Sequence, residues 1–282
     1  MHQASDDEAL IGALAADFAA IPQVDAVSLG GSRSTGRADA QSDIDLYVYS
    51  AEPVPLEQRR ELAVRRGGRF EVDNRFWEPG DEWDERATGI HVDVMYRDLA
   101  ETRAQLERVL DRHEADLGYT TCLWHNVINA RILFDRGGRL AALADFARRP
   151  YPDGLARAII GKNHPLIRDS FGAFGGQILK ATGRGDAVAV SHRTAAFLAS
   201  YFDIIFAANR APHPGEKRLL AYAAALPHVP AGMEEDVERL LSARSPAELA
   251  RLVDALTDGL DRLLEDLQLA PQARGGVAPP AP

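Results

Sequence analysis

The chain has 282 residues, of which 46% are hydrophobic, and its formal net charge at pH 7 is −10. It is long enough to form two domains, each with a buried core. Proteins that bind nucleic acid without regard to sequence rely on Lys and Arg against phosphate. The acidic balance therefore makes nucleic acid an unexpected partner and favours small-molecule or protein substrates.

The sequence suggests neither a disulfide nor a membrane segment. Cys122 is the one cysteine, so no intramolecular disulfide can form. The longest strongly apolar stretch, residues 194–208, contains Asp203 and is too short and too polar to span a bilayer. No charged-then-apolar leader follows Met1. We therefore expect a cytoplasmic protein that does not bind a membrane.

Short strands and helices alternate in the first hundred residues. Apolar and polar residues alternate through 43–49, with Ile44, Leu46 and Val48 on one face and Asp43, Asp45 and two tyrosines on the other. The glycines, proline and charges of residues 79–89 predict a loop. The remaining expected elements are a helix to about residue 20, strands at 24–29, 69–77 and 91–96, and a helix at 55–66.

From Leu99 onward the apolar spacing becomes helical. The expected helices are 99–117, 120–134, 138–148, a stretch from 153 that breaks near Pro165, 186–209 and a last helix from 246 to about 267. The change near residue 100 predicts a boundary between a catalytic domain, 1–98, and a helical bundle domain, 99–270. The Pro- and Gly-rich residues 271–282 predict a disordered tail.

A glycine pair and a serine follow the strand at 24–29. A strand that ends in Gly30-Gly31-Ser32 exposes backbone N–H groups, and glycine lets a phosphate approach them closely. Ser32 adds a hydroxyl donor, and the Arg33 guanidinium suits phosphate charge. A simple turn after the strand would have the same residues.

Asp43 and Asp45 are two apart in the next strand, so their carboxylates project from the same face. Such a pair suits one or two Mg²⁺ ions together with phosphate oxygens. A solvated strand edge would also explain Ser-Asp-Ile-Asp. Asp93 lies in another expected strand, and a neighbouring antiparallel strand would bring it beside the pair. Three converging carboxylates repel one another unless a cation is present.

Gly31-Ser32, then Asp43-Ile44-Asp45 and the later Asp93 resemble the motifs of the DNA polymerase β-like nucleotidyltransferase superfamily. The helical remainder is similar to stand-alone bacterial members that modify aminoglycosides or lincosamides. The resemblance implies an α+β fold: a small mixed nucleotidyltransferase sheet with flanking helices, followed by an all-α helical bundle domain. It also implies that Gly31 and Ser32 bind phosphates of ATP or another NTP, and that the three aspartates bind two Mg²⁺ ions.

Several other polar residues are weaker candidates. Glu82, beside Trp83, would suit a cationic acceptor. Alternatively, the tryptophan only anchors the loop on the domain core. His192 and Asp203 are eleven apart on an expected helix and so share nearly one face. Both would line an acceptor pocket, or the helix would face solvent. Lys217 begins a helix and would reach a nucleotide phosphate.

The expected reaction is Mg²⁺-dependent transfer of a nucleoside monophosphate, AMP from ATP, to a small-molecule hydroxyl, with release of pyrophosphate. Transfer of AMP to a side chain of a partner protein stays open, as does homodimer formation. The third alternative is a nucleotide-binding regulator without turnover. The intact Asp43, Asp45 and Asp93 count against that loss of activity.

Overall fold

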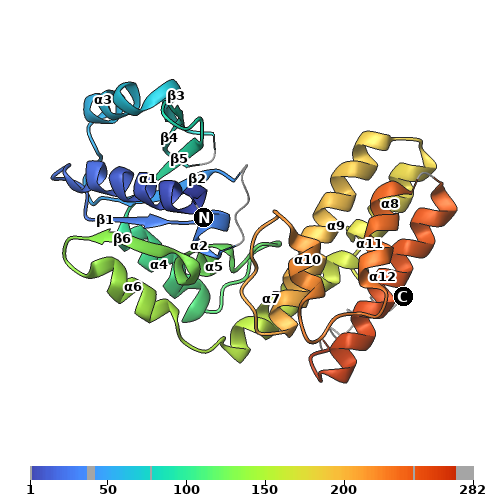
Figure 1. Ribbon diagram of the computed structural model, residues 1–282. Helices are drawn as coiled ribbons and strands as arrows, with labels where there is room; N and C mark the ends of the chain where they lie inside the picture. Colours follow the sequence, from blue (N-terminus) through green and yellow to red (C-terminus); the bar gives the residue numbers. More distant parts are fainter. Residues whose placement is uncertain (1, 37–41, 77, 244, 271–282) are drawn as a thin grey trace, which may run out of the picture. The chain divides into compact units, whose positions relative to one another are not determined.

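The computed structural model describes residues 2–36, 42–76, 78–243 and 245–270 (Figure 1). The chain divides into two compact units, one formed by residues 1–107 and 123–149 and the other by residues 108–122 and 150–282. The first unit thus takes in chain beyond residue 98. The three-part division at 98 and 270 stays a prediction, and the tail 271–282 lies outside the described residues.

The first unit is built on a mixed six-stranded sheet with strand order β3-β4-β5-β2-β1-β6. Its strands are β1 (Ala26–Leu29), β2 (Ile44–Tyr49), β3 (Gly67–Asn74), β4 (Gly80–Glu85), β5 (His91–Arg97) and β6 (Arg131–Asp135). β2 and β5 pair in parallel, and the other neighbours are antiparallel. The expected mixed sheet is therefore present.

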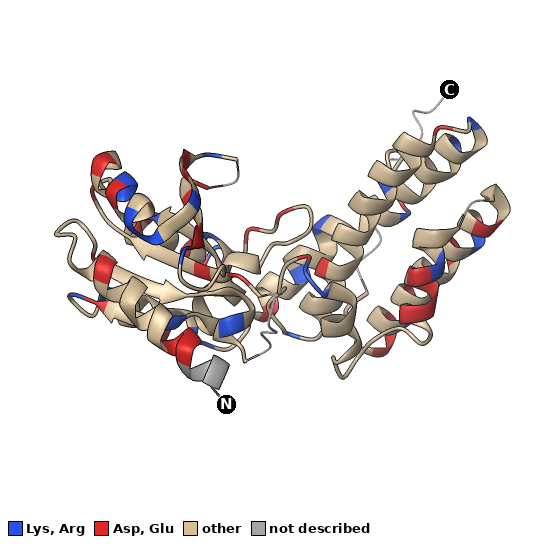
Figure 2. Ribbon diagram, turned by 45° about the horizontal axis from the view of Figure 1, so that its top comes forward, with Lys and Arg blue, Asp and Glu red and all other residues tan. Residues whose placement is uncertain are grey.

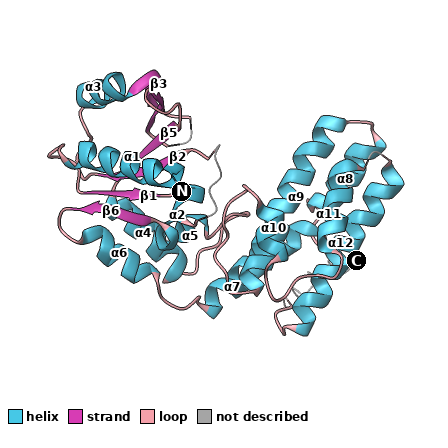
Figure 3. Ribbon diagram, viewed as in Figure 1, coloured by secondary structure: helices cyan, strands magenta, loops and turns pink. Residues whose placement is uncertain are grey.

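Helices flank this sheet on both faces, as Figures 1 and 3 show. They are α1 (His2–Ala19), α2 (Gly31–Ser34), α3 (Leu56–Arg66), α4 (Leu99–Leu110), α5 (Cys122–Asn129) and α6 (Arg139–Ala147). The core lies between the sheet and α1 and α3, where the side chains of Phe18 and Leu62 pack. Ile44, Leu46 and Val48 are fully buried in this core, so the alternation in β2 sorts its side chains as expected.

Three expectations about this unit are wrong. The acidic segment predicted as a loop forms β4, because the Asp81 side chain that it buries accepts two hydrogen bonds from Arg59, at 2.6 and 3.0 Å. Residues 131–135 form β6 at the sheet edge instead of continuing a helix. β5 runs parallel to β2, and not antiparallel, because α3, β3 and β4 connect the two strands.

The second unit is helical in its described part (Figure 3). Its helices are α7 (Asp153–Ile167), α8 (Phe174–Gly183), α9 (Ala187–Ala208), α10 (Leu219–Ala224), α11 (Met233–Ser242) and α12 (Pro246–Asp266). The hydroxyl of Ser245 accepts from the amide of Glu248 and caps α12. No helix of the described chain is long and apolar enough to cross a membrane.

Candidate functional site

Four carboxylates form one row across the sheet of the first unit. Residue pairing places Glu71 of β3 beside Glu82 of β4, Glu82 beside Asp93 of β5, and Asp93 beside Asp45 of β2. Directly paired residues of neighbouring strands project from the same face of a sheet. We call these four residues the acidic row. Like charges placed side by side destabilise a sheet, so the row suits a cationic ligand.

Asp93 lies between two other members of the acidic row, and their charges raise its pKa. Burial, and then the charges of Asp45 and Glu82, raise the pKa of Asp93 to about 6. The charge of Asp43, which directly precedes β2, acts in the same direction. Glu82 accepts a hydrogen bond from the side-chain amide of Asn74 at 3.0 Å. The backbone thus holds several carboxylates close enough to disfavour the ionisation of Asp93.

Gly31 lies directly against the carboxylate of Asp45. The amide of Gly30 donates to the backbone carbonyl of Asp45 at 2.8 Å, which extends the β1–β2 pairing to the turn. Gly31 then adopts φ = +60°, and a Cβ on it would be only 1.8 Å from Oδ2 of Asp45. Glycine is therefore required both by the backbone conformation and by the close approach. Ser32 follows in α2 and is half-buried.

Arg33 connects the turn to the segment that carries Asp43. Its Nε donates to the carbonyl oxygens of Ser42 and Asp43 at 3.1 and 3.0 Å, and its Nη2 donates to Ser42 at 2.6 Å. Its Nη1 pairs with Asp7 at 2.5 Å, and the side chain is only 7% exposed. Through these contacts Arg33 fixes the backbone that leads into β2. To contact a phosphate as expected, the Arg33 side chain would have to break these hydrogen bonds.

A buried stack supports Gly30 from the other side. A Cβ on Gly30 would be 2.4 Å from the ring of Tyr47, so backbone and ring are in close contact. The Arg97 guanidinium lies 3.9 Å from the centre of the Tyr47 ring and donates two hydrogen bonds of 2.7 Å to Glu78. Burial raises the pKa of Tyr47 to about 12, so the phenol is neutral. Sequence patterns gave no sign of this stack, because its members lie on three separate segments.

The donor set of the first unit suits Mg²⁺ in its chemistry. Hard divalent cations bind carboxylate oxygens, and Asp43, Asp45 and Asp93 provide them. Within the described ranges, no three His, Cys, Asp or Glu side chains are placed to hold one metal ion together. The backbone thus places the carboxylates of Asp45 and Asp93 side by side, and a bound cation would require their side chains to turn towards it.

Asp203, expected in an acceptor pocket, is a core residue of the second unit. Its carboxylate accepts hydrogen bonds from the amide and hydroxyl of Thr120, at 3.1 and 2.6 Å, and it is 1% exposed. Asn163 of α7 adds a longer contact of 3.4 Å. A carboxylate enclosed in this way cannot line an open pocket. It ties the segment before α5 to α9.

The other two candidates of the second unit are on its surface. His192 lies near the start of α9, and Lys217 lies before α10; both are exposed. His192 shares a helix with Asp203, yet only Asp203 is covered by neighbouring segments. Their expected contacts with acceptor and nucleotide stay predictions.

Raising the pH should destabilise the second unit through Asp203. Burial raises the pKa of Asp203 to about 7 from an ordinary value of 3.8, against the effect of the Thr120 donors. Between these values the folded state keeps a proton that the unfolded state has released. The free energy of unfolding therefore falls by about 1.4 kcal/mol per pH unit through this window, and the loss is complete above the folded pKa.

Urea unfolding of wild type and Asp203→Asn at pH 5 and pH 8 measures this effect. The variant should gain roughly 3 kcal/mol relative to wild type over that interval, since it lacks the titrating group. Asp266→Asn, an exposed change at the end of α12, should follow the wild-type pH dependence. Equal pH dependence in wild type and Asp203→Asn would show that Asp203 is ionised in the folded state throughout.

A family model matches the first part of the chain, and a solved structure is similar over most of it. Residues 11–117 match the family model described as a nucleotidyltransferase domain. No curated protein matches the chain at a significant level. Among solved structures, a nucleotidyltransferase-like protein from Exiguobacterium sibiricum 255-15 is 14% identical over 89% of this chain and 72% of that chain, with a TM-score of 0.43. A TM-score this low carries no weight for function.

Proposed function

We propose, from the match of residues 11–117 to a nucleotidyltransferase domain, that the protein transfers a nucleoside monophosphate to a small-molecule hydroxyl. AMP from ATP is the proposed donor group, Mg²⁺ the metal and pyrophosphate the product. The observation that carries this proposal is the pairing of Asp45 with Asp93 on one sheet face, with Gly31 against Asp45.

Each residue of the site has a proposed role in this reaction. The backbone of Gly31 and the hydroxyl of Ser32 would donate to the β- and γ-phosphates, since the turn leaves room for an approaching anion. Asp43, Asp45 and Asp93 would hold Mg²⁺, which when bound neutralises phosphate charge and stabilises the departing pyrophosphate. Asp93, which lies between Glu82 and Asp45 in the acidic row, would orient the attacking hydroxyl.

The transfer itself requires little covalent chemistry from the protein. The acceptor oxygen attacks the α-phosphorus, its proton is released to solvent, and the bond from the α-phosphorus to pyrophosphate breaks. Catalysis then depends on holding the hydroxyl in line with the leaving group, because correct positioning removes much of the entropic barrier. Arg33 and the Tyr47–Arg97 stack hold the two backbone segments that carry the site.

Radiolabelled ATP separates this proposal from its alternatives. The purified protein is incubated with α-labelled ATP, Mg²⁺ and either a panel of aminoglycosides and lincosamides or a cell extract. Label on a small molecule supports the proposal, and label on a protein band supports AMP transfer to a partner. ATP that binds without any release of pyrophosphate indicates a nucleotide-binding regulator. Parallel reactions with GTP, CTP and UTP identify the base.

A further inference from the structure

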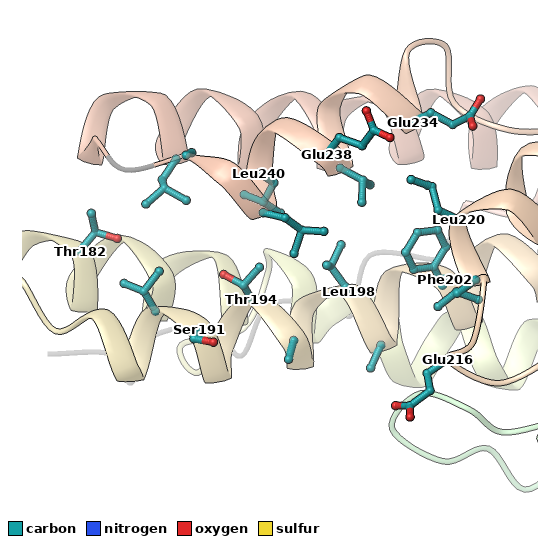
Figure 4. A pocket seen from close by; sticks show the side chains of 18 of the residues that line it. Thr182, Ser191, Thr194, Leu198, Phe202, Glu216, Leu220, Glu234, Glu238 and Leu240 are labelled. Atoms are coloured by element: carbon teal, nitrogen blue, oxygen red, sulfur yellow. The ribbon is translucent and has the colours of Figure 1, made fainter. Parts of the chain in front are cut away.

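The second unit contains a large cavity that none of the proposed catalytic residues lines. Its volume is about 1140 Å³, and it lies between α9, α10, α11 and the start of α12 (Figure 4). Ordinary small-molecule pockets measure about 300–1,000 Å³. The cavity therefore has room for an elongated organic molecule.

One wall of the cavity is an apolar stripe along α9. Helix positions three and four apart lie on one face, so residues with this spacing can form one wall of the cavity. The residues that form the stripe are Ala187, Val190, Thr194, Leu198 and Phe202. Leu240 and Leu241 of α11 lie on the facing wall, and Leu241 remains 58% exposed. Filling the cavity with an apolar group would remove this surface from water.

Carboxylates gather toward one end of the same cavity. Glu216, Glu234 and Glu238 belong to its lining, against a single basic residue, Arg218. Figure 4 shows Glu216 and Glu234 toward the end where Phe202 lies, and Thr182 toward the other. Three of the first four residues of α11 are acidic, Glu234, Glu235 and Asp236, and Figure 2 colours acidic residues red. This end has negative charge and an aromatic ring, a combination that attracts cations.

We propose that this cavity binds an amphipathic organic cation. The apolar body of the ligand lies along the α9 stripe, and its ammonium group lies near Glu216, Glu234 and Glu238. A second copy of the chain is a poorer occupant, because it would bring its own net charge of −10 toward these carboxylates. The proposal goes beyond nucleotidyl transfer and depends only on the lining of the second unit.

Titration calorimetry with three ten-carbon amphipaths tests both features of the ligand. Decyltrimethylammonium, decyl sulfonate and decanol are added to the full chain at low salt, each below the concentration at which it aggregates. The cation should bind saturably with one site per chain, about three- to tenfold more tightly than the anion, since exposed ion pairs contribute modestly. Added salt should reduce this difference.

Matched variants place the binding at the cavity. Ala195→Trp fills the cavity from α9 and should abolish binding, whereas Val188→Trp, on the same helix but outside the lining, should leave it unchanged. Glu234→Gln with Glu238→Gln should remove most of the preference for the cation. Glu235→Gln with Glu265→Gln, which removes the same charge away from the lining, should keep it.

Three results would overturn the proposal: no saturable binding of the cation to wild type, equal affinity for cation and anion, or unchanged binding by Ala195→Trp. Circular dichroism of each variant confirms that the helices are intact. Asp45→Asn, which removes a proposed metal ligand of the other unit, should bind the cation like wild type. Loss of nucleotidyl transfer and loss of cation binding are thus separate results.

Discussion

Replacing Asp45 by asparagine should reduce nucleotidyl transfer by roughly 10²- to 10⁴-fold, because the stabilisation that a bound metal gives to the transition state is worth several kcal/mol. The fold should persist, because Asp45 is only half-buried and its negative charge repels that of Asp93. The measurement is the rate of pyrophosphate release with ATP and Mg²⁺, together with a thermal melt. Full activity in this variant would remove Asp45 from the site.

Two further measurements make the Asp45 result specific. Glu71→Gln removes the same charge from the exposed edge strand of the acidic row and should keep most of the activity. Carboxyl NMR of Asp93 reports on the site without any substrate. Because the charge of Asp45 helps to raise the pKa of Asp93 to about 6, Asp45→Asn should lower that pKa. An unchanged pKa would contradict the close placement of the two side chains.

Replacing Gly31 by alanine should be nearly as damaging to transfer. The added methyl group would be 1.8 Å from Oδ2 of Asp45, and the residue would have to keep φ = +60°. Asp45 or the turn must therefore move, and small displacements of groups that position a reaction cost about 10²-fold in rate. Steady-state kinetics should show the loss, with a melting temperature only a few degrees below wild type.

Gly36 provides the matched control for backbone strain. It also has positive φ, +69°, but a Cβ there would meet nothing within 4 Å. Gly36→Ala should therefore cost about 1 kcal/mol of stability for the left-handed conformation and leave the rate almost unchanged. Equal losses of activity in both variants would mean that strain, and not contact with Asp45, explains the Gly31 effect.

The sequence predicts the strand that carries Asp45, whereas it does not predict which residues surround Asp45. Strict alternation in 43–49 predicted a strand with Asp45 on the face opposite Ile44, and the structure confirms both the strand and the burial of Ile44. The pairing of Asp45 with Asp93 depends on which strand neighbours β2 and in which direction it runs. The helix and hairpin that connect β2 to β5 determine which strand neighbours β2 and in which direction it runs. The periodicity of residues within one strand carries no information about this pairing.

The sequence-based predictions differ most from the structure where a charged side chain is buried. Residues 80–85 are rich in acids and were predicted as a loop, yet Arg59, 22 positions before Asp81 in sequence, pairs with Asp81 and lets the strand enter the sheet. Asp203 was expected in an acceptor pocket because it shares nearly one helix face with His192. Thr120 satisfies that carboxylate instead. In both cases the partner is distant in sequence, so no local pattern announces it.

The in-register pairing of β2 with β5 makes the separation of Asp45 and Asp93 independent of the length of chain that connects them. Backbone hydrogen bonds hold the two residues side by side, so added chain at the tip of the β3–β4 hairpin would leave them in place. Phe76, 77% exposed, and the neighbouring Arg75 lie at this tip. Exposed loop tips accept inserted segments well. A foreign peptide or a small domain spliced between these two residues should therefore leave the Asp45–Asp93 pair in place.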